Sequence, residues 1–262
     1  MKGMVWCKMS KKIDRTGEIG FNNDGEEMRI VRYGNRDDID IQFVKDGTVI
    51  KNRRYGNFKK GSIENPMTPS VCGIGCIGIG KFKSRDENGK PTKCYIAWRN
   101  MLMRCYDPKW HEKEPTYKGC TVCQEWWNFQ VFAEWYYKHY YELENERMTL
   151  DKDILNKGNK VYSPENCVFV PQSINNLFTK RNKLRGKYPI GVHKKRNKFQ
   201  AHLNKGDGKP IYLGLYATPN EAFLAYKHAK EKYIKEVAEE YKLYIPQKLY
   251  DAMIDYEVEI DD

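Results

Sequence analysis

The sequence predicts an α+β protein with a small N-terminal β unit, a central helical region that ends in strands and a helix, and a C-terminal three-stranded antiparallel sheet with one helix. Three observations predict this class. Short alternating segments run to about Gly80, apolar residues recur at helical spacing in mid-chain, and strand-like segments precede a long helical one near the end. The expected boundaries are 1–90, 93–183 and 188–245, followed by an acidic tail over 246–262.

Three short strands predict the N-terminal unit. The segments MRIVRY, DIDIQFV and TVIKNRRY alternate, and the turn Lys45-Asp46-Gly47 between the last two is a hairpin signal. The glycine-rich stretch from Cys72 to Phe82 lacks the Gly-Lys-Ser/Thr ending of a phosphate-binding loop and opens no helix. It is expected to be a tight β segment or a linker, and no chemistry is assigned to this unit.

Two helices are predicted in the central region from apolar residues that recur every three or four positions. The first set is Tyr95, Trp98, Met101, Leu102 and Cys105, and the second is Val122, Trp126, Phe129, Ala133 and Tyr136. Because helical periodicity alone explains these aromatic side chains, they are expected in the core rather than on a surface that stacks bases.

The charge of the chain favours a polyanionic partner. The net charge is +11, and the segment from Phe178 to Lys198 carries nine lysine and arginine residues without an acid. Such a block fits nucleic acid, since each neutralised phosphate releases counterions, although a solvated basic surface is the alternative. Six acids follow Gln247, and they form either a disordered, solvating end or a DNA mimic that competes for the basic surface.

Nothing in the sequence predicts a membrane segment. Charged residues make up 31% of the chain, and the mean hydropathy is −0.81. The chain has no run of about eighteen apolar residues and no signal-peptide core, so the expectation is an intracellular, cytoplasmic protein without a membrane partner.

The eight cysteines raise the question of a structural metal. Without a secretory signal, a disulfide framework is not expected. Cys120-Thr-Val-Cys123 has the spacing of half a zinc site, and Cys105 and Cys167 are the candidates for the other two ligands. Buried reduced thiols are the competing interpretation.

The segment 149–171 and the helix predicted after it hold the candidate catalytic residues. Asp151 lies at the end of a predicted strand, Asn166 in a tight turn, and Asn175 or Asn176 on the helix. These side chains supply the oxygen ligands that a hard divalent cation prefers. Such a cation could support phosphodiester cleavage if a general base activates water.

Three linked segments resemble the phage-encoded HNH homing endonucleases of the ββα-metal type. They are YIAWRNMLMRC, YKGCTVCQEWWNF and LDKDILNKGNKVYSPENCVFVPQSINN, and the resemblance covers about 95–181. It implies metal-dependent hydrolysis of DNA. By the same resemblance, Asp151 and Asn175 (or Asn176) would bind Mg²⁺ or Mn²⁺, and Asn166 would hold the loop.

The chain departs from this family at Lys152, which stands where active HNH enzymes place histidine. Lysine at its usual pKa cannot accept a proton at neutral pH, so it would only steady phosphate charge. Three accounts of the missing base remain open. Asp153 activates water or is a second metal ligand, His139 or His111 folds into the site, or cleavage is lost and the scaffold only binds DNA.

The C-terminal region resembles the ethylene-response-factor (APETALA-type) DNA-binding domain, which also occurs in homing endonucleases. The pieces that carry the resemblance are Gly191-Val192, Lys198-Phe199, Ala201, Tyr212-Leu213-Gly214 and Glu221-Ala222. The long helix is expected to begin with Thr218 as N-cap and Glu221 completing a capping box. In this family the sheet lies in the major groove of DNA.

Alternation along the strands sorts the two faces of this predicted sheet. Phe199, Ala201 and Leu203 are expected to face the helix. The DNA side, carried over from the resemblance, holds His193, Lys195, His202, Asn204 and Tyr212, with Arg196 and Lys198 as phosphate contacts. Histidine and lysine replace the arginines of the family at 193 and 195, so its preferred DNA sequence does not transfer.

The sequence therefore predicts a site-specific DNA endonuclease of the homing type. The rival is an inactive derivative that works as a sequence-specific transcriptional repressor, which Lys152 favours. RNA binding is a weaker third possibility, because the narrow major groove of RNA does not admit a sheet. The oligomeric state, including a homodimer, is left open.

Overall fold

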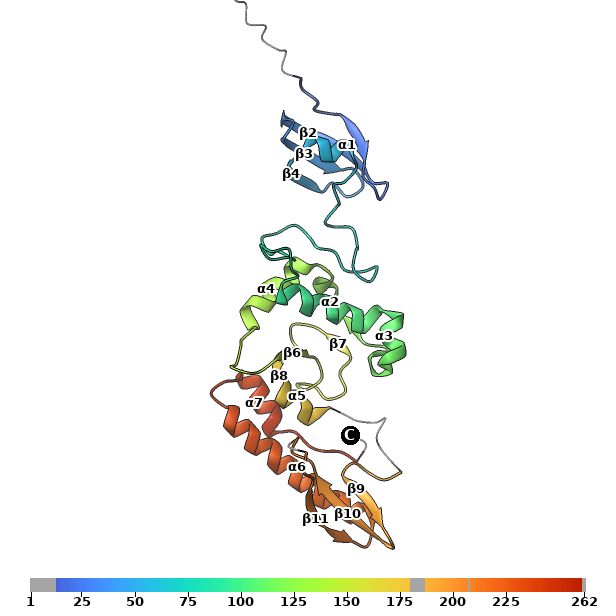
Figure 1. Cartoon of the computed structure of the whole chain (residues 1–262), viewed down its shortest axis with the longest axis vertical. Helices are drawn as coiled ribbons and strands as arrows, with labels where there is room; N and C mark the ends of the chain where they lie inside the picture. The colour runs from blue at the N-terminus through green and yellow to red at the C-terminus, as the bar shows by residue number, and fades with distance from the viewer. Residues whose placement is uncertain (1–12, 180–186, 207, 261–262) are drawn as a thin grey trace, which may run out of the picture. The chain divides into compact units, whose positions relative to one another are not determined.

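The computed structural model describes residues 13–179, 187–206 and 208–260, and the fold is of the mixed α+β kind (Figure 1). The chain divides into two compact units, Met1–Gly80 and Lys81–Asp262. The predicted class is confirmed at this level. An antiparallel sheet comes first, a helical region follows, and a second antiparallel sheet packs on a long helix.

The first unit is a four-stranded antiparallel sheet followed by a short helix. Its elements are β1 (Ile19–Phe21), β2 (Glu27–Asn35), β3 (Asp38–Phe43), β4 (Val49–Arg53) and α1 (Tyr55–Lys59), and the strands pair in chain order. The predicted hairpin turn joins β3 to β4. There Asp46 Oδ1 accepts a hydrogen bond from the Thr48 N–H at 2.9 Å, and Gly47 has a φ of 74°.

The second unit begins at Lys81, before the predicted boundary at residue 90. The Phe82 N–H donates to Gln130 Oε1 at 3.0 Å, and its carbonyl accepts from Gln130 Nε2 at 3.0 Å. The Phe82 ring stacks on Tyr137 with ring centres 5.2 Å apart. Both partners lie on α4 (Phe129–His139), so the chain ahead of residue 93 already packs with the central helices.

The central helices surround an aromatic core. They are α2 (Lys93–Tyr106), α3 (Pro108–Lys113), η1 (Pro115–Tyr117), η2 (Gln124–Trp127) and α4. Of the predicted core residues all are buried except Tyr95, which is half-buried, so the core interpretation is confirmed. The second helix starts later than predicted because Asn128 caps α4, accepting from the Gln130 N–H at 2.9 Å.

Two small sheets and a helix follow, in the order strand, loop, strand, helix. β6 (Met148–Asp151) pairs antiparallel with β8 (Val168–Pro171), and α5 (Gln172–Phe178) comes directly after β8. β5 (Thr121–Val122) pairs in parallel with β7 (Val161–Tyr162), which ties the loop between β6 and β8 to the helical region.

The C-terminal sheet has the predicted three strands and helix. They are β9 (Val192–Lys195), β10 (Lys198–Leu203), β11 (Ile211–Tyr216) and α6 (Pro219–Tyr241). β10 lies in the middle and pairs antiparallel on both sides. The predicted capping box is present, with the Glu221 N–H donating to Thr218 Oγ1 at 3.2 Å. Gly191 is required, because a Cβ there would lie 2.1 Å from the Tyr226 ring.

α6 belongs to two hydrophobic cores. Its first half packs Ala222, Phe223 and Tyr226 against the sheet. Its second half shares a core with β8 and α5, and the buried members of that core are Ile154, Val168, Val170, Ile174, Ile234, Val237, Ala238, Ile245, Leu249 and Met253. The predicted domains 93–183 and 188–245 are therefore packed on a common helix.

The acidic tail is folded, and its prediction as a disordered end is wrong. α7 (Gln247–Ile254) packs on α6 through Leu249 and Met253, which are completely buried. Val258 is 3% exposed in the core beneath the sheet. Asp251, Asp255, Glu257 and Glu259 are exposed, while the apolar residues Leu249 and Met253, four apart, lie on the buried side.

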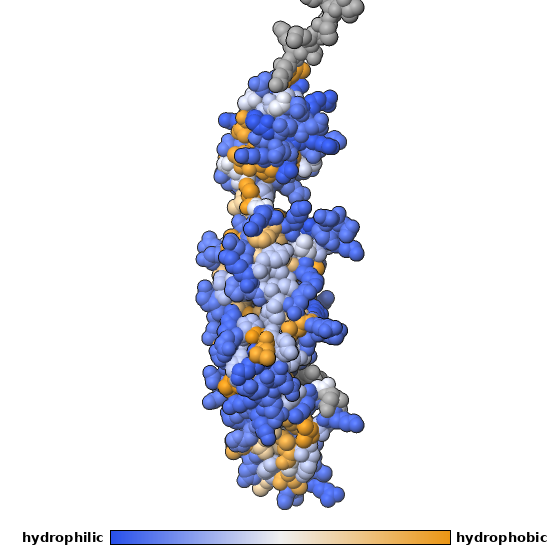
Figure 2. Space-filling model, turned by 90° about the vertical axis from the view of Figure 1, so that its left-hand side faces the viewer, coloured by the Kyte–Doolittle hydropathy of each residue, from blue (hydrophilic) through white to orange (hydrophobic). Residues whose placement is uncertain are grey.

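The face of the molecule shown in Figure 2 is mainly hydrophilic. Figure 2 shows a face on which hydrophobic side chains form small groups between hydrophilic ones. Among the helices of residues 13–179, 187–206 and 208–260, none has the length and apolar character needed to cross a membrane.

Candidate active site and nucleic-acid interface

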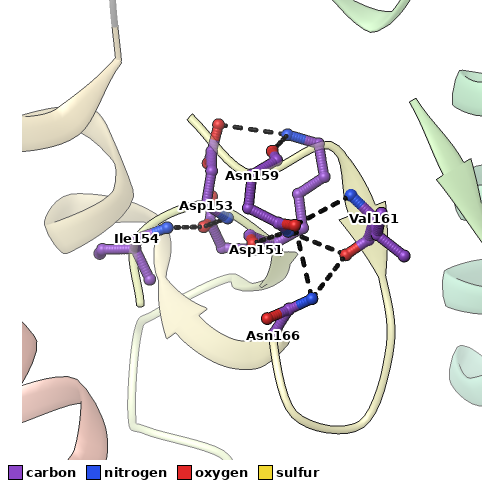
Figure 3. Close-up of polar contacts among 7 residues, drawn as sticks. Asp151, Asp153, Ile154, Asn159, Val161 and Asn166 are labelled. Carbon is purple, nitrogen blue, oxygen red and sulfur yellow. Dashed lines mark hydrogen bonds and ion pairs between the residues drawn. The ribbon is translucent and has the colours of Figure 1, made fainter. Parts of the chain in front are cut away.

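Asp151 ends β6 and shapes the turn that follows it (Figure 3). Its Oδ1 accepts hydrogen bonds from the N–H groups of Asp153 at 2.9 Å and Ile154 at 2.8 Å. Ile154 is buried in the core shared with α6, which anchors the turn. The carboxyl of Asp151 is thus fixed at the strand end, with the Asp153 carboxyl close to it.

The Asp151 carboxyl is in an unfavourable electrostatic environment. Burial, and then the neighbouring Asp153 carboxylate, raise the pKa of Asp151 to about 6, and the two backbone N–H bonds only partly offset this. Ionised carboxylates that repel each other in a half-buried place are stabilised by a cation between them. Their oxygen atoms therefore fit a hard divalent cation such as Mg²⁺ or Mn²⁺.

Asn175 is the more available of the two predicted helix ligands. Asn176 Oδ1 accepts from Gln172 Nε2 at 2.9 Å along the exposed side of α5. Asn175 is half-buried, and within the described part of the chain its amide has no hydrogen-bond partner. In those same residues no three His, Cys, Asp or Glu side chains meet as metal ligands, so a cation at Asp151 would need amide oxygen and water besides the carboxylates.

Lys152 is buried and committed to the loop. Its Nζ donates to the Asn159 carbonyl at 2.9 Å and lies 3.2 Å from Asp153 Oδ2 and 5.8 Å from the centre of the Tyr162 ring. Burial lowers the pKa of this ammonium, but the attraction of Asp153 outweighs it and the net pKa is raised. Lys152 therefore stays protonated and cannot serve as a general base.

Three asparagines hold the loop between β6 and β8 in place, and Figure 3 shows two of them, Asn159 and Asn166. Asn159 Nδ2 donates to the carbonyls of Lys152 at 2.6 Å and Val161 at 2.8 Å. Asn166 Nδ2 reaches Asn159 Oδ1 at 3.4 Å, and Asn156 Nδ2 donates to Asn166 Oδ1 at 2.9 Å. Asn166 accordingly lies at the loop, next to the segment that carries the carboxyls, and its side chain bonds to Asn156, Asn159 and Val161.

The two alternative histidine bases are engaged with backbone carbonyls. His139 Nδ1 lies 2.7 Å from the Trp135 carbonyl, and its ring stacks on Trp135 at 4.7 Å. His111 Nε2 lies 2.9 Å from the Arg104 carbonyl. Each ring must carry its proton on the nitrogen that faces the carbonyl, which leaves only the opposite nitrogen to accept one.

The four cysteines proposed for zinc do not form a metal site. Cys105, Cys120 and Cys167 are buried and Cys123 is half-buried, but among the described residues they do not come together as a ligand set. Burial raises the pKa of the Cys120 and Cys167 thiols and that of Cys123 to about 11. Cys105, Cys120 and Cys167 match the competing interpretation of the sequence, that of buried reduced thiols.

Arg104 is a candidate residue that the sequence did not single out. It lies in the last turn of α2, with its guanidinium carbon 5.5 Å from the centre of the Tyr117 ring. Burial lowers its pKa, but Tyr162, Tyr117 and Asp151 outweigh this and the net pKa is raised. A second permanent cation therefore lies within electrostatic reach of Asp151. No motif marks it, because only the packing of α2 beside β7 brings it there.

The outer face of the C-terminal sheet presents a row of rings. The His193 and His202 ring centres are 5.6 Å apart, as are those of His202 and Tyr212. Ala201 and Leu203 are buried on the opposite face, as alternation predicts. Burial, and then His193 and Lys195, lower the pKa of His202, so its neutral ring can both donate and accept hydrogen bonds.

The remaining predicted DNA contacts surround this row. Lys195 and Lys198 are exposed and pair across the β9–β10 turn, where Arg196 has a φ of 51°. Asn204 is exposed, but its Oδ1 accepts from the Gly206 N–H at 2.8 Å, which leaves its amide nitrogen for a base. Part of the basic segment, residues 180–186, lies outside the described residues.

Comparison of the chain with family models, with curated proteins and with solved structures gave no match.

Proposed function

We propose that the chain is a site-specific, metal-dependent DNA endonuclease of the homing type. The observation that carries the proposal is the pair of crowded carboxyls, Asp151 and Asp153, in a unit that also presents an aromatic and basic sheet face. A carboxyl whose ionised form is disfavoured by burial and by a neighbouring acid is costly to the fold, and such a cost is typical of a cation-binding catalytic site.

In this proposal Asp151 and Asn175 hold a divalent cation. When bound, the cation neutralises charge that develops on the phosphate during cleavage. Asp153 is exposed, and Lys152 occupies only one of its oxygens, so the other can orient a water molecule and accept its proton. Arg104 and Lys152 supply fixed positive charge beside the carboxyls.

The C-terminal sheet selects the DNA site. His193, His202 and Tyr212 would face base edges in the major groove, and Lys195, Arg196 and Lys198 would contact phosphates. With base contacts and phosphate contacts together, the protein would act as an intracellular, DNA-bound protein. The resemblance to the ethylene-response-factor domain and the observed exposure of this face both support it.

A second function, repression by site-specific binding without cleavage, is favoured by one observation. Lys152 stays protonated where the resemblance places a histidine base. In that case the C-terminal sheet would bind DNA as proposed, and Asp151 and Asp153 would be left over from an active site that no longer cleaves.

The two functions are separated by incubating the full chain with DNA that flanks its own coding sequence, in Mg²⁺ or Mn²⁺. The endonuclease makes breaks at one position, and EDTA or the substitution Asp151→Asn abolishes them. Binding at one position in a footprint, without breaks in either metal, would establish the repressor instead.

A further inference from the structure

A cavity of about 350 Å³ lies between α2, α4 and β6. Its apolar part is formed by Ile96, Leu150 and Phe169. Arg104 and Arg147 contribute guanidinium groups to the same lining. Thr149 and Leu150, which also line it, immediately precede Asp151, so the cavity adjoins the candidate site along β6.

The charges of the cavity are not balanced. Lys93 Nζ and Glu142 Oε1 form an ion pair at 2.5 Å, and Glu146 accepts a hydrogen bond from the Tyr241 hydroxyl at 3.0 Å. Across the described ranges, neither Arg104 nor Arg147 forms an ion pair within 4 Å, and the carboxylate that acts on Arg104 from farther away is Asp151. Two guanidinium groups that form no close ion pair in one cavity are expected to attract an anion.

Arg104 is also held in place before any anion arrives. Its guanidinium lies over the Tyr117 ring and beside the Tyr162 hydroxyl, both of which interact with it. The backbone carbonyl of Arg104 accepts a hydrogen bond from the His111 ring, with His111 Nε2 at 2.9 Å. This bond fixes the end of α2. An ordered, half-buried arginine loses little conformational entropy on binding, and its planar fork matches two phosphate oxygens.

We propose that this cavity is a phosphate site, in which Arg104 and Arg147 bind a phosphodiester group of nucleic acid. Identifying the group as part of the strand cut at Asp151 rests on the proposed function. The cavity itself would bind phosphate whether or not the chain cleaves DNA. Bidentate contacts from two arginines would hold the strand against β6, with its next phosphate towards the carboxyls.

Thermal unfolding of the full chain in inorganic phosphate tests the site without relying on cleavage. Potassium chloride at matched ionic strength is the reference. Phosphate should raise the melting temperature of the wild type in a saturable way. Arg104→Gln and Arg147→Gln should each weaken the apparent phosphate affinity about tenfold or more, since each removes a charged hydrogen-bond donor. Arg99→Gln, an exposed position on the same helix, is the matched control and should match the wild type.

A gel-shift titration with double-stranded DNA distinguishes free phosphate from a nucleic-acid phosphate. Each variant should lower the slope of log affinity against log salt by about one. If Arg104→Gln does not fold, Arg104→Lys keeps the charge without the planar fork and should still weaken phosphate binding severalfold. A wild type without a saturable phosphate response, or variants that keep the full response, would overturn the proposal. A saturable phosphate response of the wild type that both variants lose, in a chain that never cuts DNA, would refute only the endonuclease.

Discussion

The Lys152 ammonium donates to the Asn159 carbonyl at 2.9 Å, and Asn159 Nδ2 donates back to the Lys152 carbonyl at 2.6 Å. This reciprocal pair closes the loop that carries Asp153. Lys152 is therefore part of the scaffold of the candidate site. Its charge also neutralises Asp153 at 3.2 Å.

Lys152→Met should destabilise the chain by about 2 kcal/mol, because it leaves the Asn159 carbonyl and the Asp153 carboxylate without a buried donor. Urea unfolding measures the change. Lys160→Met, an exposed lysine of the same loop, should stay within about 0.5 kcal/mol of the wild type. Equal stability of both variants would show that the loop does not depend on Lys152.

Asp151→Asn should stabilise the chain at neutral pH while removing metal-dependent cleavage. The folded-state pKa is raised to about 6, above the value of the unfolded chain, so this group contributes stability below the unfolded pKa. That contribution is lost as the pH rises through about 6. An amide avoids the loss and still accepts the two backbone N–H bonds.

The free energy of unfolding of Asp151→Asn should exceed that of the wild type by about 1–2 kcal/mol at pH 7–8, allowing for partial exposure. The difference should vanish near pH 4. Melting curves across this pH range measure it. Asp107→Asn is the matched control, because Asp107 caps α3 by accepting from the Lys109 N–H, which asparagine also does. A destabilised Asp151→Asn at pH 7 would contradict the crowding of the carboxyls.

His202→Ala should weaken binding to the selected DNA site by about 1–3 kcal/mol and binding to random DNA by much less. The site is first obtained by selection from a random DNA library, and both affinities are read from gel shifts. Lys198→Gln is the comparison, since a phosphate contact should weaken both affinities alike. Equal losses on both DNAs for His202→Ala would remove it from base recognition.

The pKa of His202 also sets a dependence of stability on pH. This pKa is lowered in the folded chain by burial and by His193 and Lys195. The stability it contributes is present above the unfolded pKa of about 6.5 and is lost as the pH falls through the folded value. The wild type should therefore lose more stability than His202→Asn between pH 7 and pH 5.

Leu249→Ala and Met253→Ala should each cost about 2–5 kcal/mol, because both side chains are completely buried between α7 and α6. Asp255→Asn, an exposed acid just after α7, should change stability by less than about 0.5 kcal/mol. Urea unfolding of the three variants gives the comparison. A tail that only solvates the chain would leave all three unchanged.

Local patterns predicted much of this fold. Thr218 and Glu221 marked the start of α6, the Asp46–Gly47 turn marked a hairpin, and alternation in β10 separated Ala201 from His202. Each of these depends on residues close together in the chain. The order of strand, loop, strand and helix around Asp151 was predicted for the same reason.

Long-range packing explains what the sequence did not predict. The acids after Gln247 dominated the composition of the segment 246–262 and concealed the spacing of Leu249 and Met253 in α7, whose partners come from β8, α5 and α6. Arg104 reaches the candidate site only because α2 packs near Tyr162. The cysteines have zinc-like spacing in the chain, but spacing does not determine whether thiols converge.

The position of α6 in two cores has a consequence for protein engineering. Consider a chimaera in which a foreign module, joined in the segment 180–186, replaces the C-terminal sheet and all that follows it. This exchange would discard Ile234, Val237 and Ala238 together with the sheet. The apolar surfaces of β8 and α5 would then be exposed to water, and the recipient would aggregate. A working exchange must keep the second half of α6 and all of α7 from the recipient and introduce the new sheet by a junction within the helix, between Tyr226 and Ile234.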